Sequence, residues 1–551
     1  MSTTETAPAQ PTAAPPGTPV DRRWFLVLAG AFLATRLFGV HAFVPHNDET
    51  IYALEARDAA KDWSANKYIT LDGRQFGDYR QPLLCWLTAW TVSPGGDPLV
   101  GVRTVTLAAA AVGFAFVVLL VSRVCGPRAA LWTGWLYVLS AYYGYFDCIA
   151  LNEPLLYGLA CAYLWALYES LTGRRWLAVL AAILVAGMLL TKDSARVWVL
   201  VSALVPPLAW TARYGTPLHG LRHLRAGIDV GLTVAVAAAG FALHATAVPA
   251  AFDGVRAQSP QAAMTLTPAE LAELPIAVWR KNVEFLIDQV LMLDLGYFGL
   301  LGAAALCAAV VVRSFRTGDR SGRWIVLLLA SMFAVSCLSV AAVAKIDFVR
   351  YYGTGLFLLY AAVATAADLL VRSRPGRAWP ALAVVVALVG LGTVRLDDTY
   401  LPAKRWGQSD LGMSETPGGW ANGLGLPDLK TALHKLGPGV VLLDPQWGFP
   451  QAYVELYRAE YPRLGLIELS SDVIQQALAE HLNRRLPGDH LYLVLDSVRP
   501  FVPDLLGRLA AHPQFVIETK TVSKTYRDRK REDSSILIVT VSRRPRPPAG
   551  R

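Results

Sequence analysis

The stretch His46–Trp63, HNDETIYALEARDAAKDW, carries five acidic residues and stands between two long apolar runs. Its apolar residues recur at helical spacing, while Glu55, Asp58 and Asp62 fall on another face. This pattern predicts an amphipathic helix that lies on a membrane surface. We expect these three acids to keep the polar face of the helix in water.

Asp48 and Glu49 precede the predicted helix. Free backbone N–H groups and the helix dipole favour a carboxylate at that place. One acid alone would satisfy this capping role, so two interpretations stay open for the pair. Either the acids only cap the helix, or one of them is catalytic.

The rest of the chain is strongly apolar. Of its 551 residues, 54% are hydrophobic and 17% are charged, and the mean hydropathy is +0.37. Soluble domains are nearer to about one quarter charged. The apolar residues form runs of about 20 residues, the length that crosses a bilayer core. The sequence therefore predicts a mainly α-helical polytopic membrane protein.

We place about eleven membrane spans on these runs, because each one is long enough to cross. They are Trp24–Phe43, Pro98–Ser122, Arg128–Phe146, Pro154–Ser170, Arg175–Leu190, Ala195–Ala212, Ala226–Pro249, Asp294–Val312, Trp324–Ala344, Phe348–Val371 and Ala378–Val394. No signal-peptidase site follows the first run, so we expect it to be retained as a span.

The basic loops give the orientation of the spans. The arginines of residues 22–23, 123–128, 174–175, 213–225, 313–323 and 372–377 fall on one side, which the positive-inside rule makes cytoplasmic. They account for the net charge of +9 without a nucleic acid partner. An odd number of spans then places the segment after residue 396 outside.

That final segment is polar and contains short runs typical of β-strands. They are VVLLD (440–444), LYLVLD (491–496), FVIETKTV (515–522) and ILIVTV (536–541), with helical stretches such as SSDVIQQALAEHLNRRL (470–486) between them. They predict a small α/β domain on the outer membrane face. No nucleotide fingerprint or nucleophile elbow is present in its sequence.

The chain is thus divided into four parts. We expect a disordered cytoplasmic leader (1–21), a membrane domain (22–396) whose outer loop 44–97 holds interfacial helices, an extracytoplasmic α/β domain (397–541) and a flexible tail (542–551).

Several cations break the charge rule, because they fall at the outer ends of spans. Arg80 lies in FGDYRQPLLCWLTAW, Lys192 and Arg196 lie in LLTKDSARVW, and Lys345 and Arg350 lie in AKIDFVRYYG. Charges at such places are often functional, and together they predict a site for an anion at the membrane surface. Glu153, in CIALNEPLL, opens a span on the same side, either as a helix-start acid or as part of that site.

The residues from 48 to 89, DETIYALEARDAAKDWSANKYITLDGRQFGDYRQPLLCWLTA, resemble the first outer loop of membrane glycosyltransferases of the GT-C fold. The similar branch contains aminoarabinose transferases that modify lipid A and protein O-mannosyltransferases, in glycosyltransferase families 39 and 83. The matching residues are Asp48-Glu49, Tyr52, Glu55, Arg57, Leu71-Asp72-Gly73, Pro82, Leu83 and Trp86. Further along, ALNEPLL (150–156), LLTKDSARV (189–197) and KIDFVRYY (345–352) resemble later motifs of the same family.

The resemblance implies a GT-C fold and transfer of a sugar from a polyprenyl-phosphate carrier to an extracytoplasmic acceptor, which is a lipid, a glycan or a protein. It implies a multi-pass enzyme of the inner (plasma) membrane, with Asp48, Glu49 and Glu153 as catalytic acids. The implied phosphate-binding residues are Arg80, Lys192, Arg196, Lys345, Arg350 and Tyr351.

Some positions depart from the family pattern. Arg80-Gln81-Pro82 stands for Lys-Pro-Pro, and Tyr79 replaces an acid. Because an acid that could bind a metal ion is missing, no metal ligands are assigned. A divalent cation stays open as a cofactor. A different class also stays open, namely a transporter or export component for a lipid-linked or anionic substrate. The chain shows no paired half-sequences of the kind that many transporters have.

Overall fold

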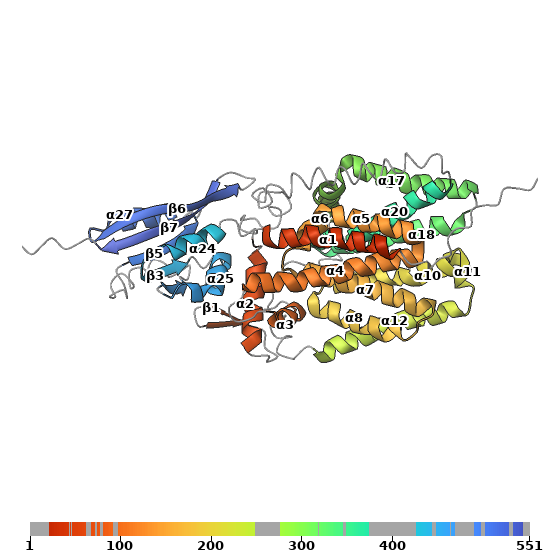
Figure 1. The fold of residues 1–551 in the computed structure, drawn as a ribbon, viewed down its shortest axis with the longest axis horizontal. Helices are drawn as coiled ribbons and strands as arrows, with labels where there is room; N and C mark the ends of the chain where they lie inside the picture. The colour runs from red at the N-terminus through yellow and green to blue at the C-terminus, as the bar shows by residue number, and fades with distance from the viewer. Residues whose placement is uncertain are drawn as a thin grey trace, which may run out of the picture.

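The computed structural model describes residues 21–42, 45, 47–61, 68–71, 74–77, 81–91, 97–247, 276–317, 319–344, 349–373, 426–443, 448–462, 464–468, 490–496, 502–527 and 533–543. These residues form a long bundle of apolar helices with a smaller α/β part at one end (Figure 1). The expected leader before residue 21, the span at 378–394, the helix at 470–486 and the last residues of the expected tail lie outside the described residues.

The bundle contains a series of helices joined by short turns. They are α1 (Arg22–Ala42), α4 (Pro98–Cys125), α5 (Pro127–Leu139), α6 (Ala141–Phe146), α7 (Asn152–Thr172), α8 (Leu177–Thr191), α9 (Ala195–Val201), η1 (Ser202–Leu204), α10 (Val205–Tyr214), α11 (Pro217–Leu221), α12 (Arg225–Ala247), α16 (Ile276–Phe285), η2 (Leu286–Leu291), α17 (Met292–Thr317), α18 (Arg320–Val343), α19 (Val349–Gly353) and α20 (Leu356–Ser373). The described residues of each predicted span up to Phe348–Val371 are mainly helical, but Arg128–Phe146 is divided between α5 and α6, and Phe348–Val371 is divided between α19 and α20. By length and composition, 6 helices in the described part of the chain can cross a membrane.

Local sequence explains where the helix α4 begins and ends. Asp97 caps its first turn by accepting a hydrogen bond from the backbone N–H of Leu99 at 2.9 Å, and Pro98 follows as the first helical residue. The helix stops at Gly126, whose φ of 102° suits glycine. In its middle, α4 meets α7 so closely that a Cβ on Gly113 would lie 2.7 Å from the Cα of Gly158. Small residues of this kind allow two membrane helices to pack tightly.

The first loop forms α2 (Asn47–Lys61), a hairpin of β1 (Tyr68–Leu71) and β2 (Arg74–Gly77), and α3 (Leu83–Ala89). The strands pair antiparallel. The predicted helix is confirmed, but Asp48 and Glu49 lie within its first turn rather than ahead of it.

One expectation for this loop is wrong. The acids Glu55 and Asp58 are only 1% and 2% exposed, so they do not form a solvated face. Helices α3, α4 and, from the α/β part, α25 (Gly448–Leu456) pack against α2, which carries both acids. Asp58 is partnered by Arg57, with its Oδ1 3.3 Å from Nε. Asp62 lies outside the described residues.

The α/β part is a five-stranded mixed sheet with helices. Its elements are α24 (Leu426–His434), β3 (Gly439–Leu443), α25, η4 (Arg458–Glu460), β4 (Leu464–Glu468), β5 (His490–Asp496), α27 (Val502–Ala511), β6 (Phe515–Arg527) and β7 (Asp533–Arg543). The strand order is β4-β3-β5-β7-β6, and the first three strands run parallel. The four predicted strands are confirmed, whereas β4 was not expected. Strand β7 also runs into the segment expected to be a flexible tail.

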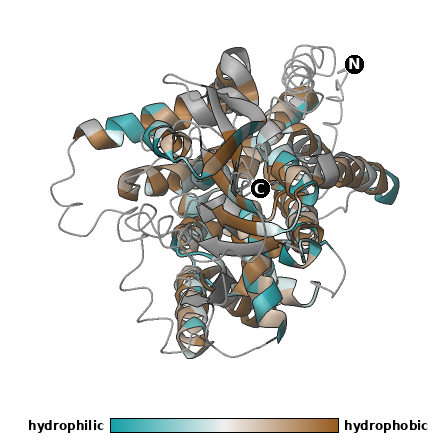
Figure 2. Ribbon diagram, turned by 90° about the vertical axis from the view of Figure 1, so that its left-hand side faces the viewer, coloured by the Kyte–Doolittle hydropathy of each residue, from teal (hydrophilic) through white to brown (hydrophobic). Residues whose placement is uncertain are grey.

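The α/β part rests on the first loop. Figure 1 places it beyond α2, and in Figure 2 it lies in front of the bundle helices, which are seen end-on. Arg57 on α2 donates from Nη1 to the carbonyl of Glu455 at 3.1 Å. The hydroxyl of Tyr457 donates to the Asp97 carboxylate at 2.9 Å. Burial raises the pKa of Tyr457 and the charge of Asp97 raises it further, so this hydroxyl stays a donor.

Candidate active site

Charged side chains from distant parts of the chain meet at the end of the bundle that carries the α/β part. Asp48 comes from the first turn of α2 and Glu153 from the first turn of α7. Lys192 follows the last residue of α8, and Arg350 and Tyr351 lie on the short helix α19. We call these five residues the Arg350 cluster.

Arg350 joins the two acids of the cluster. Its Nη1 lies 2.8 Å from Oδ2 of Asp48, and its Nε lies 3.7 Å from Oε1 of Glu153. Its side chain is 11% exposed and that of Asp48 is 15% exposed, whereas Glu153 is 2% exposed. Asp48 is thus the acid of the cluster that solvent reaches most.

Lys192 completes the cluster. Its Nζ contacts the Glu153 carboxylate and lies 4.0 Å from the ring centroid of Tyr351. The guanidinium of Arg350 lies 5.4 Å from the same ring. A ring face between two cations is a cation–π arrangement. The hydroxyl of Tyr142 also donates to the carbonyl of Arg350 at 2.8 Å, which holds α19 against α6.

Glu49 points into the bundle instead. Its carboxylate is fully buried and accepts two hydrogen bonds from Arg103, at 2.8 Å from Nε and 2.7 Å from Nη2. Arg103 also donates to the carbonyl of Val40 at 2.6 Å. The backbone N–H of Ala150 donates to Glu49 as well. One carboxylate therefore ties α2 to α4 and to the turn that leads to Glu153.

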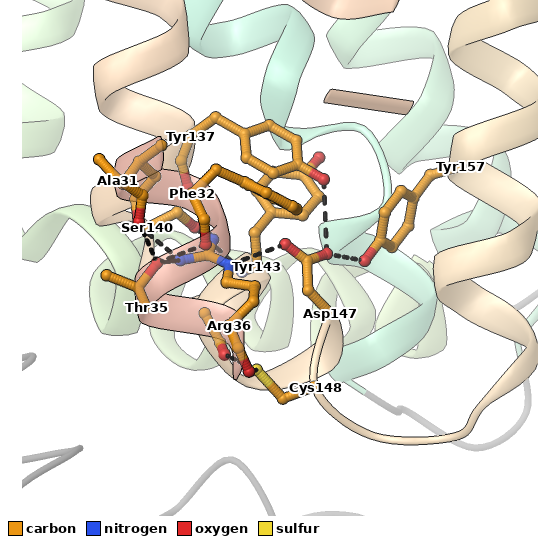
Figure 3. Close-up of polar contacts among 12 residues, drawn as sticks. Ala31, Phe32, Thr35, Arg36, Tyr137, Ser140, Tyr143, Asp147, Cys148 and Tyr157 are labelled. Carbon is orange, nitrogen blue, oxygen red and sulfur yellow. Dashed lines mark hydrogen bonds and ion pairs between the residues drawn. The ribbon is translucent and has the colours of Figure 1, made fainter. Parts of the chain in front are cut away.

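A second buried ion pair holds the other end of that turn. Figure 3 shows Arg36 of α1 reaching Asp147, with Nε 3.0 Å from Oδ2. Both side chains are 0% exposed. Tyr157 donates its hydroxyl to the same carboxylate, and Tyr137 lies 3.4 Å from it. Residues 147–151 thus run between two anchored ends just before Glu153.

Arg36, Arg103 and Asp147 were not predicted as site residues from the sequence. Each of them stands in or beside an apolar run, where an ionisable residue is costly and usually has a partner. That rule would have marked all three as structurally or functionally important, although not which one pairs with which.

The remaining expected site residues are placed differently. Arg196 is exposed on α9, and among the described residues it forms no ion pair with an acid of the cluster. Arg80 and Lys345 lie outside the described residues. Gln81, which follows Arg80, donates to Asp193 at 3.1 Å. The end of the first loop therefore meets the residue next to Lys192.

A divalent cation needs oxygen ligands that converge on one point. No group of three or more His, Cys, Asp and Glu among the described residues is placed to hold a metal ion. The two acids of the Arg350 cluster are both paired with cations. Hard divalent cations need several oxygen ligands, and the described residues of the cluster supply two carboxylates, each in contact with a cation.

The fold has known counterparts. The structure of ArnT from Cupriavidus metallidurans in the apo state has a TM-score of 0.53 at 16% identity, over 94% of this chain and 98% of that one. The ArnT structure bound to undecaprenyl phosphate gives 0.50 at 14% identity, with 94% and 98% covered. An apo oligosaccharyltransferase from Archaeoglobus fulgidus gives 0.47 at 12% identity, over 86% of this chain and 69% of that one. No protein-family model and no curated protein matches the sequence.

The similarity to the two ArnT structures, together with the apolar helices, shows the class of fold. The chain is a multi-pass membrane protein with the GT-C fold, as the first-loop resemblance indicated.

Proposed function

We propose that this chain is an integral membrane glycosyltransferase that uses a polyprenyl-phosphate sugar. It passes the sugar to a lipid, glycan or protein acceptor on the extracytoplasmic side of the membrane, by one inverting displacement. The observation that carries the proposal is the Arg350 cluster, in which a partly exposed carboxylate lies beside two cations at one end of the bundle. The proposed partners are the lipid-linked donor, the acceptor and the bilayer, in which the donor's isoprenoid tail stays.

The cations suit a phosphate leaving group. A polyprenyl phosphate can leave without protonation when cations neutralise the charge that develops on its oxygens. Arg350 and Lys192 are placed for this, and a guanidinium fork can hold two phosphate oxygens at once. Arg80 and Lys345 are proposed helpers, and Arg196 would attract the anion from the surface.

Asp48 is the proposed base. The acceptor oxygen or nitrogen attacks the anomeric carbon as the bond from that carbon to the phosphate oxygen breaks. The electron pair of the broken bond stays on the phosphate, and the acceptor's proton passes to the Asp48 carboxylate. A base of ordinary carboxylate strength suffices, because the proton leaves only as the new bond forms.

Donor binding would also prepare the base. In the structure Arg350 lies against Asp48 at 2.8 Å, so the carboxylate and an incoming phosphate compete for one guanidinium. A phosphate that takes over Arg350 leaves Asp48 able to accept the proton. The donor therefore competes with Asp48 for the guanidinium of Arg350 and weakens this ion pair.

Glu153 and Glu49 support this arrangement from behind. Glu153 contacts both Lys192 and Arg350, so its proposed role is to position the two cations. Glu49, fixed by Arg103, is proposed to orient the first turn of α2 and with it Asp48.

The test is a turnover assay on the purified protein in nanodiscs. Polyprenyl-phosphate sugars are supplied as a panel, with and without EDTA, and free polyprenyl phosphate is measured. Release that depends on an acceptor, with inverted product, is the expected result. Donor that crosses the bilayer of a proteoliposome without being consumed would instead identify a transporter.

A further inference from the structure

A cavity lies at the opposite end of the bundle from the Arg350 cluster. Helix α7 begins with Glu153 at the cluster and ends at Thr172 beside the cavity, and α4 ends there too. The cavity has a volume of about 380 Å³. Its polar lining consists of Arg123, Tyr168, Glu169, Thr172, Arg174 and Arg213, and we call it the arginine cavity.

Cations outnumber acids in this lining. Glu169 is the acid, and its two carboxylate oxygens face two different arginines. Oε1 lies 3.1 Å from Nε of Arg123, and Oε2 lies 3.7 Å from Nε of Arg174. Arg213 adds a third guanidinium. The lining therefore carries an excess of positive charge around a space large enough for a small polar group.

Arg213 differs from arginines that only set the orientation of membrane spans. Such arginines normally extend their charged ends into water. Nη1 of Arg213 is instead buried, and it has no hydrogen-bond partner among the residues that the structure describes. A buried guanidinium nitrogen without an acceptor is costly, and a bound anion would satisfy it.

The surroundings indicate where this anion comes from. Trp176 lies two residues after Arg174 of the cavity lining and is 69% exposed. Leu221 and Leu224, which follow α10 in the chain, are 58% and 92% exposed. Exposed tryptophan at a helix end is typical of the membrane–water interface. This favours a position of the cavity near the lipid headgroups, on the side opposite the Arg350 cluster.

We propose that the arginine cavity binds the phosphate group of an anionic phospholipid. Arg213 and Arg174 donate to the phosphate oxygens, while Glu169 keeps Arg123 and Arg174 in place. Basic pockets between membrane helices are known to take lipid headgroups, and two-direction guanidinium contacts favour phosphate. This site is separate from the proposed donor site, since α4 and α7 span the distance between the two.

Native mass spectrometry and thermal unfolding test the proposal. The parent protein in nanodiscs of phosphatidylcholine is compared with the same protein in nanodiscs that also contain phosphatidylglycerol. We expect phosphatidylglycerol to remain bound to the parent and to raise its Tm. In Arg174→Gln/Arg213→Gln, binding should weaken about tenfold or more, because charge-assisted hydrogen bonds are lost.

Arg222→Gln is the matched control, since Arg222 is exposed at the same end of the bundle and lies outside the cavity lining. It removes one positive charge, as Arg213→Gln alone does, and it should retain the parent's binding. Equal losses in both variants would overturn the site in favour of general surface attraction. Inorganic phosphate that raises the Tm of the parent as much as phosphatidylglycerol does would overturn the lipid assignment. If the double variant does not fold, Arg213→Gln alone carries the same comparison.

Discussion

The Arg350 cluster and the Arg36–Asp147 pair both join an arginine to a carboxylate, but their surroundings differ. The side chains of Arg350 and Asp48 are 11% and 15% exposed, whereas those of Arg36 and Asp147 are both 0% exposed. Arg36 also donates to the backbone carbonyls of residues 137 and 138, which fixes its guanidinium from several sides. Separating a buried ion pair costs much free energy, because it leaves an uncompensated charge inside the protein. An ion pair that water reaches costs less to separate, so its members can exchange partners.

The same difference is repeated within one turn of α2. Glu49 is buried against Arg103, and Asp48 faces Arg350 at the partly exposed cluster. Consecutive residues on a helix point about 100° apart, so neighbours in the sequence face different surroundings. Two adjacent acids can therefore hold a structure and serve a reaction at the same time.

The largest expected effect on sugar transfer comes from Asp48, the partly exposed acid of the two. Asp48→Asn should slow sugar transfer roughly 10²–10⁴-fold, because it removes the proposed base. The variant should bind the donor as well as the parent or better, since Asp48 no longer competes for Arg350. Single-turnover transfer and donor binding are measured separately. Asp193→Asn is the control, because it lies beside Lys192 and its amide oxygen can still accept from Gln81. Full turnover in Asp48→Asn would leave Asp48 as a helix-start acid only.

The next effect concerns the stability that the buried ion pair of Glu49 and Arg103 contributes. Arg103→Met leaves the Glu49 carboxylate buried without its guanidinium, and this should cost about 3–5 kcal/mol of stability. Thermal unfolding in nanodiscs measures the loss. Adding Glu49→Met to this variant removes the unpaired charge and should recover part of the stability. If the double variant were no more stable than Arg103→Met, the pair would not be the cause of the loss.

A smaller change separates charge from geometry in the cluster. Arg350→Lys retains the positive charge but loses the fork that reaches both Asp48 and Glu153. We expect turnover to fall about tenfold, the equivalent of about 1.4 kcal/mol for one weakened charged contact. Arg350→Gln should fall further. Equal activities of the two variants would show that the charge of Arg350 plays no part.

The smallest effect is expected where the α/β part rests on α2. Arg57→Ala removes the contact to the Glu455 carbonyl, a partly buried bond that is worth about 1 kcal/mol. Limited proteolysis of the α/β part measures the loosening. Arg508→Ala breaks an exposed pair with Asp504 within the α/β part and should leave the cleavage rate unchanged. Equal cleavage of the two variants would contradict the role of Arg57 in docking.

Much of this arrangement was predictable, and the failures have a common cause. The helix α2 and the strands at 440, 491, 515 and 536 follow from periodicity, and Glu153, Lys192 and Arg350 were found as charges at span ends. The pairing of Arg103 with Glu49, 54 residues away, depends on how helices cross, which no local pattern records. Glu55 and Asp58 were expected to be solvated because the local sequence does not show that α25 packs against α2. The contact of Arg57 with Glu455 of α25 joins residues that are 398 positions apart.

The shared guanidinium of Arg350 has a consequence for the order of events in a catalytic cycle. A single cation that serves either Asp48 or a phosphate makes the two sites thermodynamically linked, and such linkage is reciprocal. Under the proposed function, an acceptor bound at the Asp48 carboxylate and a donor bound at Arg350 would therefore strengthen each other's binding. Steady-state kinetics should then show a sequential mechanism, in which both substrates are bound before either product leaves. The carrier lipid would then act as a competitive inhibitor towards the donor and as a noncompetitive one towards the acceptor.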